Sequence, residues 1–106
     1  MTTIAYGVCE CTHRLYNQYS NIMRKTEIRH ISKNGDIEIC ATYLNKYSPI
    51  YNLCTHILIL NGMAGQIMND DVRREYEKRI IIGKSKKFAF FNFNDDIYSV
   101  SLEYKK

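Results

Sequence analysis

Residues 26–43 read TEIRHISKNGDIEICATY, two runs of strand-forming residues joined at Asn34-Gly35. This pair tolerates the positive φ angles of a two-residue type I′ turn, so the stretch predicts a β-hairpin. Such a turn sets Ser32 opposite Ile37, His30 opposite Ile39 and Ile28 opposite Ala41. One face of the hairpin then carries Ile28, His30, Ile37, Ile39, Ala41 and Tyr43. Since this register separates apolar from polar side chains, it predicts a hairpin with one face buried.

The segments on either side of the hairpin predict one strand and two helices. Alternation over Thr2–Cys9 predicts a strand, and apolar spacing predicts a helix from about His13 to Arg24. After the hairpin, Ser48-Pro49 is typical of a helix start, and the apolar positions continue with helical spacing to Leu60. The β-branched content of Leu53–Leu60 leaves a strand open as the alternative there.

The last third of the chain predicts a helix followed by a second hairpin. Asn69 is a suitable N-cap for a helix that places Val72, Tyr76 and Ile80 on one face. Lys87–Phe93 and Ile97–Tyr104 then alternate around a turn at residues 94–96. The order β-α-β-β-α-α-β-β predicts an α+β fold, an antiparallel sheet with two or three helices packed on one face. Its first part resembles the element order of ferredoxin-like sandwiches.

Composition limits the class of protein. The chain has 106 residues, of which 45% are hydrophobic, and this predicts a single domain over residues 1–106. It contains no apolar run of the roughly 20 residues that a membrane span requires, and no export signal is recognisable. We therefore expect a cytoplasmic protein, without membrane association, that keeps its cysteines as thiols. The abundance of Ile, Asn, Lys, Tyr and Phe indicates an A/T-rich gene, as in many phages and mobile elements.

Cysteine and histidine residues form two short clusters that are candidates for a zinc site. Zinc prefers thiolate and imidazole ligands in a tetrahedral arrangement. The five candidate ligands are Cys9, Cys11, His13, Cys54 and His56. The alternative is that these cysteines are small buried apolar residues and that no metal is bound.

Residues 86–93 read KKFAFFNF and are a candidate nucleic-acid-binding strand. The stretch resembles the RNP1 segment of RNA-recognition motifs, in which alternating aromatic side chains follow a basic residue, although Lys87 stands where that segment has glycine. The resemblance implies that Phe88 and Phe90 stack on bases while Lys86 and Lys87 contact phosphates. The alternative is a strand buried on both faces.

Tyrosines and basic residues form a third candidate, a protein-binding surface. Tyrosine is enriched at interfaces because its ring buries a large area while its hydroxyl keeps a partner. The candidate contact residues are Tyr43, Tyr47, Tyr51, Arg73, Arg74 and Lys78. A net charge of +4 favours an acidic protein as the partner. In the alternative interpretation, Arg73, Arg74 and Lys78 form a solvated helix face in which Glu77 compensates Arg73.

The sequence contains no recognisable catalytic motif, and its candidate general bases near neutral pH are His13, His30 and His56. We therefore expect a small non-enzymatic binding protein that occupies a partner's surface, for example an inhibitor encoded by a phage or mobile element. Single-stranded nucleic-acid binding and a zinc-stabilised domain are the alternatives.

Overall fold

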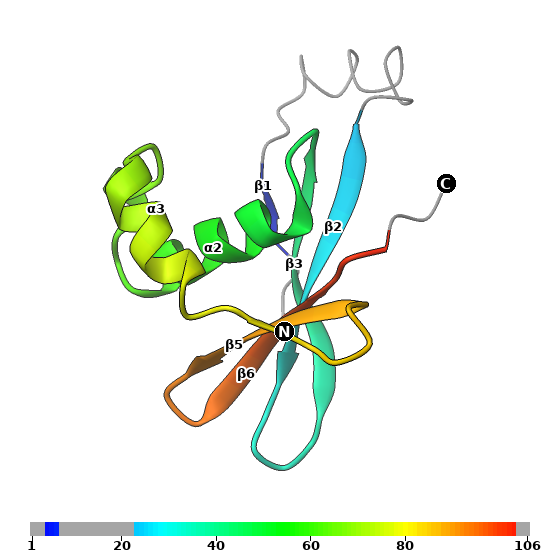
Figure 1. Cartoon of the computed structure of the whole chain (residues 1–106). Helices are drawn as coiled ribbons and strands as arrows, with labels where there is room; N and C mark the ends of the chain where they lie inside the picture. Colours follow the sequence, from blue (N-terminus) through cyan, green and yellow to red (C-terminus); the bar gives the residue numbers. More distant parts are fainter. Residues whose placement is uncertain (1–3, 7–22, 104–106) are drawn as a thin grey trace.

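The computed structural model describes residues 4–6 and 23–103 as a six-stranded sheet with two α-helices (Figure 1). The elements, in chain order, are β1 (Ile4–Tyr6), β2 (Arg24–Ile31), β3 (Ile37–Asn45), α2 (Pro49–Leu60), the 3₁₀ turn η1 (Ala64–Gln66), α3 (Asp70–Glu77), β4 (Ile81–Ile82), β5 (Phe88–Phe93) and β6 (Asp96–Ser101). The strands lie in the order β1-β3-β2-β6-β5-β4. The β1–β3 pair is parallel, and every other neighbouring pair in this sheet is antiparallel.

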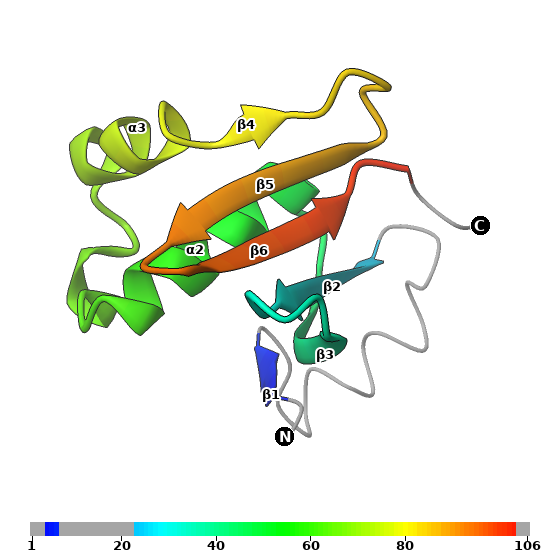
Figure 2. The same ribbon diagram turned by 90° about the horizontal axis from the view of Figure 1, so that it is seen from below.

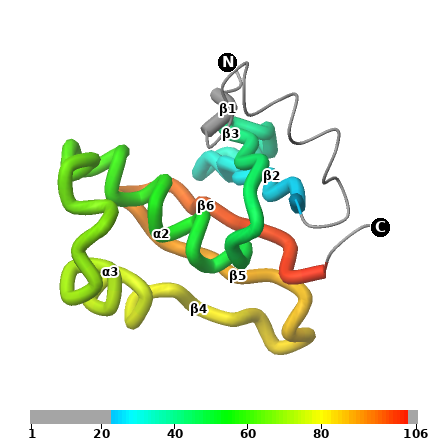
Figure 3. The backbone as a smooth tube through the Cα atoms, turned by 90° about the horizontal axis from the view of Figure 1, so that it is seen from above, coloured from blue at the N-terminus to red at the C-terminus, as the bar shows by residue number. Residues whose placement is uncertain are grey.

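The helices cover one face of the sheet. Seen from below, β5 and β6 lie in front of α2, whereas from above α2 lies in front of them (Figures 2 and 3). The shorter α3 packs beside α2, and its Tyr76 ring stacks on Phe91 of β5 at 6.4 Å between ring centres. Neither helix in the described part of the chain has the length and apolar character needed to cross a membrane.

The core lies between α2 and the sheet. Leu53 and Ile57 supply the helix side of this core, while the sheet supplies side chains from four strands. The core side chains that the sheet contributes are Ile28, Cys40, Ala41, Tyr43, Ala89, Phe91 and Val100. The spacing of Leu53 and Ile57 within Pro49–Leu60 confirms the helix, so the alternative strand over Leu53–Leu60 is wrong.

The hairpin β2–β3 forms as predicted, but its turn end has a different register. Ile28 pairs with Ala41 as expected, whereas Arg29 pairs with Ile39, because Cys40 is an extra residue on β3 that forms a β-bulge. From there to the turn, the strands are shifted by one residue and the β3 side chains point to the other face. Ile37, predicted to face the core, is therefore 63% exposed.

The turn of this hairpin is also longer than two residues. It is closed by backbone hydrogen bonds from Ser32 N to Asp36 O and from Gly35 N to Ser32 O, both of 2.9 Å. Gly35 has a φ of 88°, but Asn34 does not have the positive φ that a type I′ turn requires. The prediction of a hairpin at this site is confirmed, and the prediction of its turn type is wrong.

Four further expectations require correction or lie outside the described residues. The predicted helix from His13 to Arg24 does not include Arg24, which begins β2, and residues 7–22 lie outside the description. Helix α3 ends at Glu77 instead of continuing to Ile80, and the short strand β4 follows. The second hairpin turns at Asn94-Asp95, because Phe93 pairs directly with Asp96. The α+β class is confirmed, but the strand order differs from a simple ferredoxin-like layout.

Candidate functional site

The turn between β3 and α2 is held by a pair of asparagine side chains. Asn45 Nδ2 donates to Asn52 Oδ1 at 2.9 Å, and Asn52 Nδ2 donates back to Asn45 Oδ1 at 3.1 Å. Asn52 is buried and also donates to Thr26 Oγ1 at 2.9 Å, which ties the first turn of α2 to β2. Asn45 Oδ1 accepts a further bond from the backbone N–H of Tyr47 at 3.0 Å. The backbone that carries Tyr47 is therefore fixed by the sheet and the helix together.

The start of α2 presents Tyr51 on its outer surface. Ser48 is the N-cap, and its Oγ accepts a hydrogen bond from the backbone N–H of Tyr51 at 3.1 Å. Pro49 follows at the first helical position, where its missing N–H costs no helical hydrogen bond. Tyr51 stacks on Tyr47 with ring centres 4.3 Å apart and planes inclined by 27°.

Arg73 of α3 lies against the same tyrosine. Its guanidinium carbon is 3.6 Å from the centre of the Tyr51 ring, a cation–π contact. Since Tyr47 and Arg73 both lie this close to the ring centre, they occupy opposite faces of it. Tyr47, Tyr51 and Arg73 form a continuous stack, which we call the Tyr47 stack.

Arg73 is buried and makes its hydrogen bonds to neutral acceptors. Its side chain donates to the main-chain oxygens of Ile67 and Tyr51 and to Thr55 Oγ1. No carboxylate lies within ion-pair distance of Arg73 in the described part of the chain, so the predicted compensation by Glu77 does not occur as an ion pair. The planar guanidinium joins α3 to α2 through two of these bonds, to Tyr51 O and Thr55 Oγ1, and leaves a positive charge beneath the surface.

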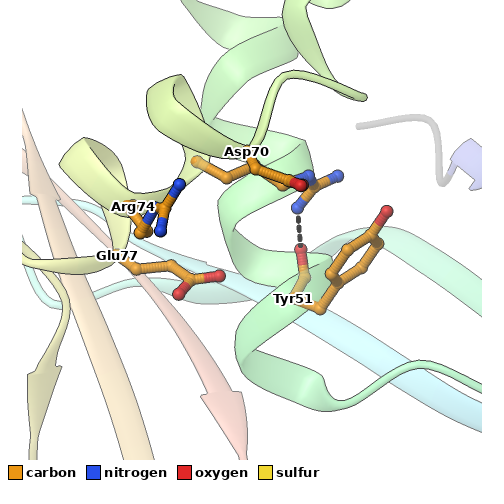
Figure 4. Close-up of a pocket in the computed structure, with 5 residues that line it drawn as sticks. Tyr51, Asp70, Arg74 and Glu77 are labelled. Carbon is orange, nitrogen blue, oxygen red and sulfur yellow. Dashed lines mark hydrogen bonds between the residues drawn. The ribbon is translucent and has the colours of Figure 1, made fainter.

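A shallow hollow of about 310 Å³ adjoins the Tyr47 stack (Figure 4). Asp70, Arg74 and Glu77 of α3 line it together with Tyr51 and Arg73. Arg74 is exposed and pairs with Asp71 at 2.8 Å. The hollow therefore offers both charge signs beside an aromatic surface, which suits a polar side chain of a partner.

The structure brings together four of the six predicted protein-contact residues. Tyr47, Tyr51, Arg73 and Arg74 meet at the hollow or the stack, although they come from segments more than 20 residues apart. Lys78 is exposed at the end of α3 and pairs with Glu75 at 3.2 Å. Tyr43 is 1% exposed and packs in the core, so its predicted role as a contact residue is wrong. Arg73 acts from beneath Tyr51 rather than on a solvated helix face.

A second polar cluster lies inside the core, around His56 of α2. His56 Nε2 is 3.6 Å from Cys40 Sγ, and its Nδ1 is 3.3 Å from Tyr43 Oη. Burial lowers the pKa of His56 to about 4, and burial raises the pKa of the Cys40 thiol. At pH 7 the pair is a neutral imidazole and a protonated thiol, which is the reverse of an activated cysteine nucleophile.

The predicted zinc ligands in the described part of the chain point to different partners. Cys54 Sγ lies 3.7 Å from the main-chain oxygen of Arg73, whereas His56 faces Cys40 across the core. No group of three metal-ligating side chains occurs in residues 4–6 and 23–103. Cys9, Cys11 and His13 lie outside the described residues, so the zinc hypothesis stays a prediction.

His30, the remaining histidine of the described chain, lies between two carboxylates. Its Nδ1 is 3.8 Å from Glu38 Oε1 on β3, and its Nε2 is 3.3 Å from Asp96 Oδ2 on β6. The Tyr98 ring lies beside it at 5.1 Å between ring centres. His30 thus lies beside residues of three neighbouring strands at the turn end of the first hairpin, and its buried Nε2 has no hydrogen-bond partner in the described part of the chain.

The predicted nucleic-acid strand is β5, and its aromatic side chains lie on both faces of the sheet. Phe91 is buried beneath the helices, while Phe88 and Phe90 share the opposite face, with ring centres 6.4 Å apart. Lys86 and Lys87 are exposed in the turn before β5. The four predicted residues therefore lie next to one another, at one end of the sheet.

Sequence reasoning missed Asn45, Asn52 and Cys40. Asn45 and Asn52 lie on either side of the Ser48-Pro49 helix start, and asparagine side chains at such a turn are a signal of local hydrogen bonding. Cys40 gave no local signal, because its partner His56 comes from a different element.

No family model matches this chain, and neither the curated proteins nor the solved structures contain a significant match to it.

Proposed function

We propose that this chain is a non-enzymatic protein-binding module whose central contact is Tyr47. The observation that carries the proposal is that Tyr47 is 44% exposed and yet stacked on Tyr51 at 4.3 Å. A large aromatic side chain held in one conformation loses little conformational entropy when a partner covers it. Such side chains are typical of the energetic centre of protein interfaces.

The partner that suits this surface best is a protein with an acidic face. The chain has a net charge of +4, and exposed Lys46 lies just before α2, whereas Arg74 of α3 and Lys78 at its end are already paired with Asp71 and Glu75. Asp70 and Glu77 also line the hollow, so the partner group that enters it should offer hydrogen-bond donors as well as negative charge.

The mode of action that we propose is occupation of the partner's surface, without bond making by this chain. The two described thiols support a binding role, since burial raises the pKa of both Cys40 and Cys54 and keeps them protonated at neutral pH. An inhibitor encoded by a phage or mobile element remains our proposal for the biological setting, and it depends on the abundance of amino acids that A/T-rich codons encode.

The test compares capture of a partner by the wild type and by two single variants. Tagged protein is used to recover stoichiometric partners from native host cells, and the identified partner is purified and titrated calorimetrically. Tyr47→Ala should weaken the affinity roughly 30-fold, the loss expected for a central aromatic contact. Leu60→Ala, an exposed apolar residue at the other end of α2, is the matched control and should change it less than about threefold.

Two results would contradict the proposal. One is that no protein is recovered in stoichiometric amount from the native host. The other is a purified complex whose dissociation constant is the same for Tyr47→Ala and for the wild type, since the partner would then bind elsewhere.

A further inference from the structure

The face of the sheet opposite α2 carries an aromatic pair beside a lysine-rich turn. Strand pairing sets Phe90 of β5 level with Ser99 of β6 and Ile81 of β4, on the face away from the core residues Ala89 and Phe91. Phe88 lies two residues earlier on the same face and is 40% exposed. In Figure 2 this face of β5 and β6 is turned toward the reader, with α2 behind it.

The two aromatic rings are held in place by the backbone around them. Their centres are 6.4 Å apart and their planes are inclined by 37°. Gly83 lies directly against Phe90, since a Cβ atom at this position would lie 3.2 Å from the Phe90 ring. Phe90 therefore rests on bare backbone, and Phe88 beside it stays open to solvent.

The turn that precedes Phe88 concentrates positive charge. Lys84, Lys86 and Lys87 fall within four residues, and all three are exposed. The turn is closed by hydrogen bonds from Gly83 N to Phe88 O and from Lys86 N to Gly83 O, both of 2.9 Å. Lys87 Nζ is 4.0 Å from Glu103, whereas Lys84 and Lys86 have no carboxylate partner in the described part of the chain. Two lysines are thus free to bind an anion.

A third cation lies across the sheet from this turn. Arg29 of β2 pairs with Ser99, which in turn pairs with Phe90, so Arg29 and Phe90 are two strands apart on one face. With neighbouring strands about 4.8 Å apart, this places Arg29 about 10 Å from Phe90. Positive charge therefore lies on both sides of the aromatic pair. A short nucleotide chain can span the distance between these charges.

We infer that this face, with Phe88, Phe90, Lys84, Lys86 and Arg29, binds single-stranded nucleic acid. Exposed aromatic rings provide stacking platforms for bases of any sequence, and the flanking cations hold the phosphates. The aromatic pair favours single-stranded nucleic acid over an acidic protein surface. An acidic protein would bind the lysines but would have no use for an exposed aromatic ring. The Tyr47 stack lies at the start of α2, on the helix-covered side, so the two proposals can fail independently.

The experiment measures fluorescence anisotropy with labelled 12-mers of dT and rU, titrated with the full chain at about 50 and 200 mM salt. If three cations contact phosphates, the affinity should fall roughly 20-fold between these salt concentrations. Lys84→Gln/Lys86→Gln should reduce this salt effect to roughly threefold. Lys33→Gln/Lys46→Gln removes the same charge from other exposed positions and should behave like the wild type.

Two variants of Phe88 separate base stacking from general hydrophobic contact. Phe88→Tyr keeps an aromatic ring and should retain the affinity, whereas Phe88→Leu should weaken it roughly tenfold. Because Phe88 is partly exposed, both variants should keep the circular dichroism spectrum of the wild type.

The inference is overturned if neither oligonucleotide binds at micromolar protein and low salt. An equal loss of affinity for the oligonucleotides in the two lysine double variants would show that binding responds to net charge only. This result would also overturn the inference. A 12-residue polyglutamate peptide serves as the competitor. If it displaces the oligonucleotides at equal concentration, the face is an acidic-protein site and the inference is wrong.

Discussion

His56 places an ionisable group in the centre of the core, between Cys40 and Tyr43. Burial lowers its pKa from 6.5 to about 4. Between these values the unfolded chain binds a proton that the folded protein does not bind. Its contribution to stability is therefore complete above pH 6.5 and is lost as the pH falls toward 4.

We expect the free energy of unfolding, measured with urea, to be lower at pH 4 than at pH 7.5 by about 3 kcal/mol through this group. His56→Gln keeps a neutral hydrogen-bonding side chain that does not titrate. The variant is less stable at neutral pH, but its stability should depend less on pH, and the difference between the two pH profiles isolates His56. Parallel profiles for wild type and variant would show that His56 is not buried as described.

Arg73 supplies the second prediction at this scale. Lysine has a single ammonium group, which cannot reach Ile67, Tyr51 and Thr55 together, so Arg73→Lys leaves buried acceptors unpaired. We expect it to lower the free energy of unfolding by about 2–3 kcal/mol. Arg74→Lys, at an exposed position one residue along the helix, is the control and should change it by less than about 0.5 kcal/mol. Thermal and urea unfolding of both variants measure this difference.

The burial of individual tyrosines could not be predicted from the sequence. Tyr43 and Tyr47 lie four residues apart, yet Tyr43 is in the core and Tyr47 is at the surface. Tyr43 faces α2 because it belongs to a strand with one covered face, whereas Tyr47 follows the end of that strand. The residue type predicts an amphipathic position, and only the packing of α2 decides which tyrosine is buried.

Among the elements, α2 begins at its N-cap Ser48, and its first turn carries Tyr51 of the Tyr47 stack. The third prediction concerns its N-cap. Ser48→Ala removes the acceptor of the Tyr51 N–H and should cost about 1 kcal/mol of unfolding free energy, whereas Ser48→Gly should cost only a few tenths. Urea titrations of the two variants check this order. Equal stability of both variants and the wild type would mean that the cap does not hold the helix start.

The hairpin β2–β3 shows why element types were predictable and their register was not. Alternation and Asn34-Gly35 predict two strands and a turn, because both signals are local. The bulge at Cys40 also has a contact from outside the hairpin, since Cys40 Sγ lies 3.6 Å from His56 Nε2 of α2 as well as near Ile28 O within the hairpin. A pattern of apolar residues within the hairpin does not contain this contact with α2.

For the whole molecule, strand order was the feature that local signals could not supply. The second hairpin joins the first through the β6–β2 pair, which sets Arg29 opposite Ser99, 70 positions away in the chain. Element order alone is compatible with several positions of this hairpin. The sequence predicted the tyrosines and Arg73 of the Tyr47 stack as contact residues, but not that they meet. Their meeting depends on the packing of α3 against α2.

The fourth prediction concerns the two described thiols, which are shielded by the fold as a whole. Both Cys40 and Cys54 are buried and have raised pKa values, so a thiol reagent should reach them only when the structure opens. In the variant Cys9→Ser/Cys11→Ser, we expect Ellman's reagent to react at least roughly 100-fold more slowly in native buffer than in guanidinium. Adding Ser85→Cys in the exposed turn supplies a fast-reacting control. Fast reaction of both native thiols without denaturant would contradict the burial.

The β4 margin of the described sheet is very short. β4 spans two residues, although its neighbour β5 is rich in phenylalanine. A long open margin would offer a row of unpaired backbone groups to a neighbouring chain, the first step of fibril growth. With so little to extend, this aggregation-prone composition is compatible with a protein that stays dispersed at high concentration.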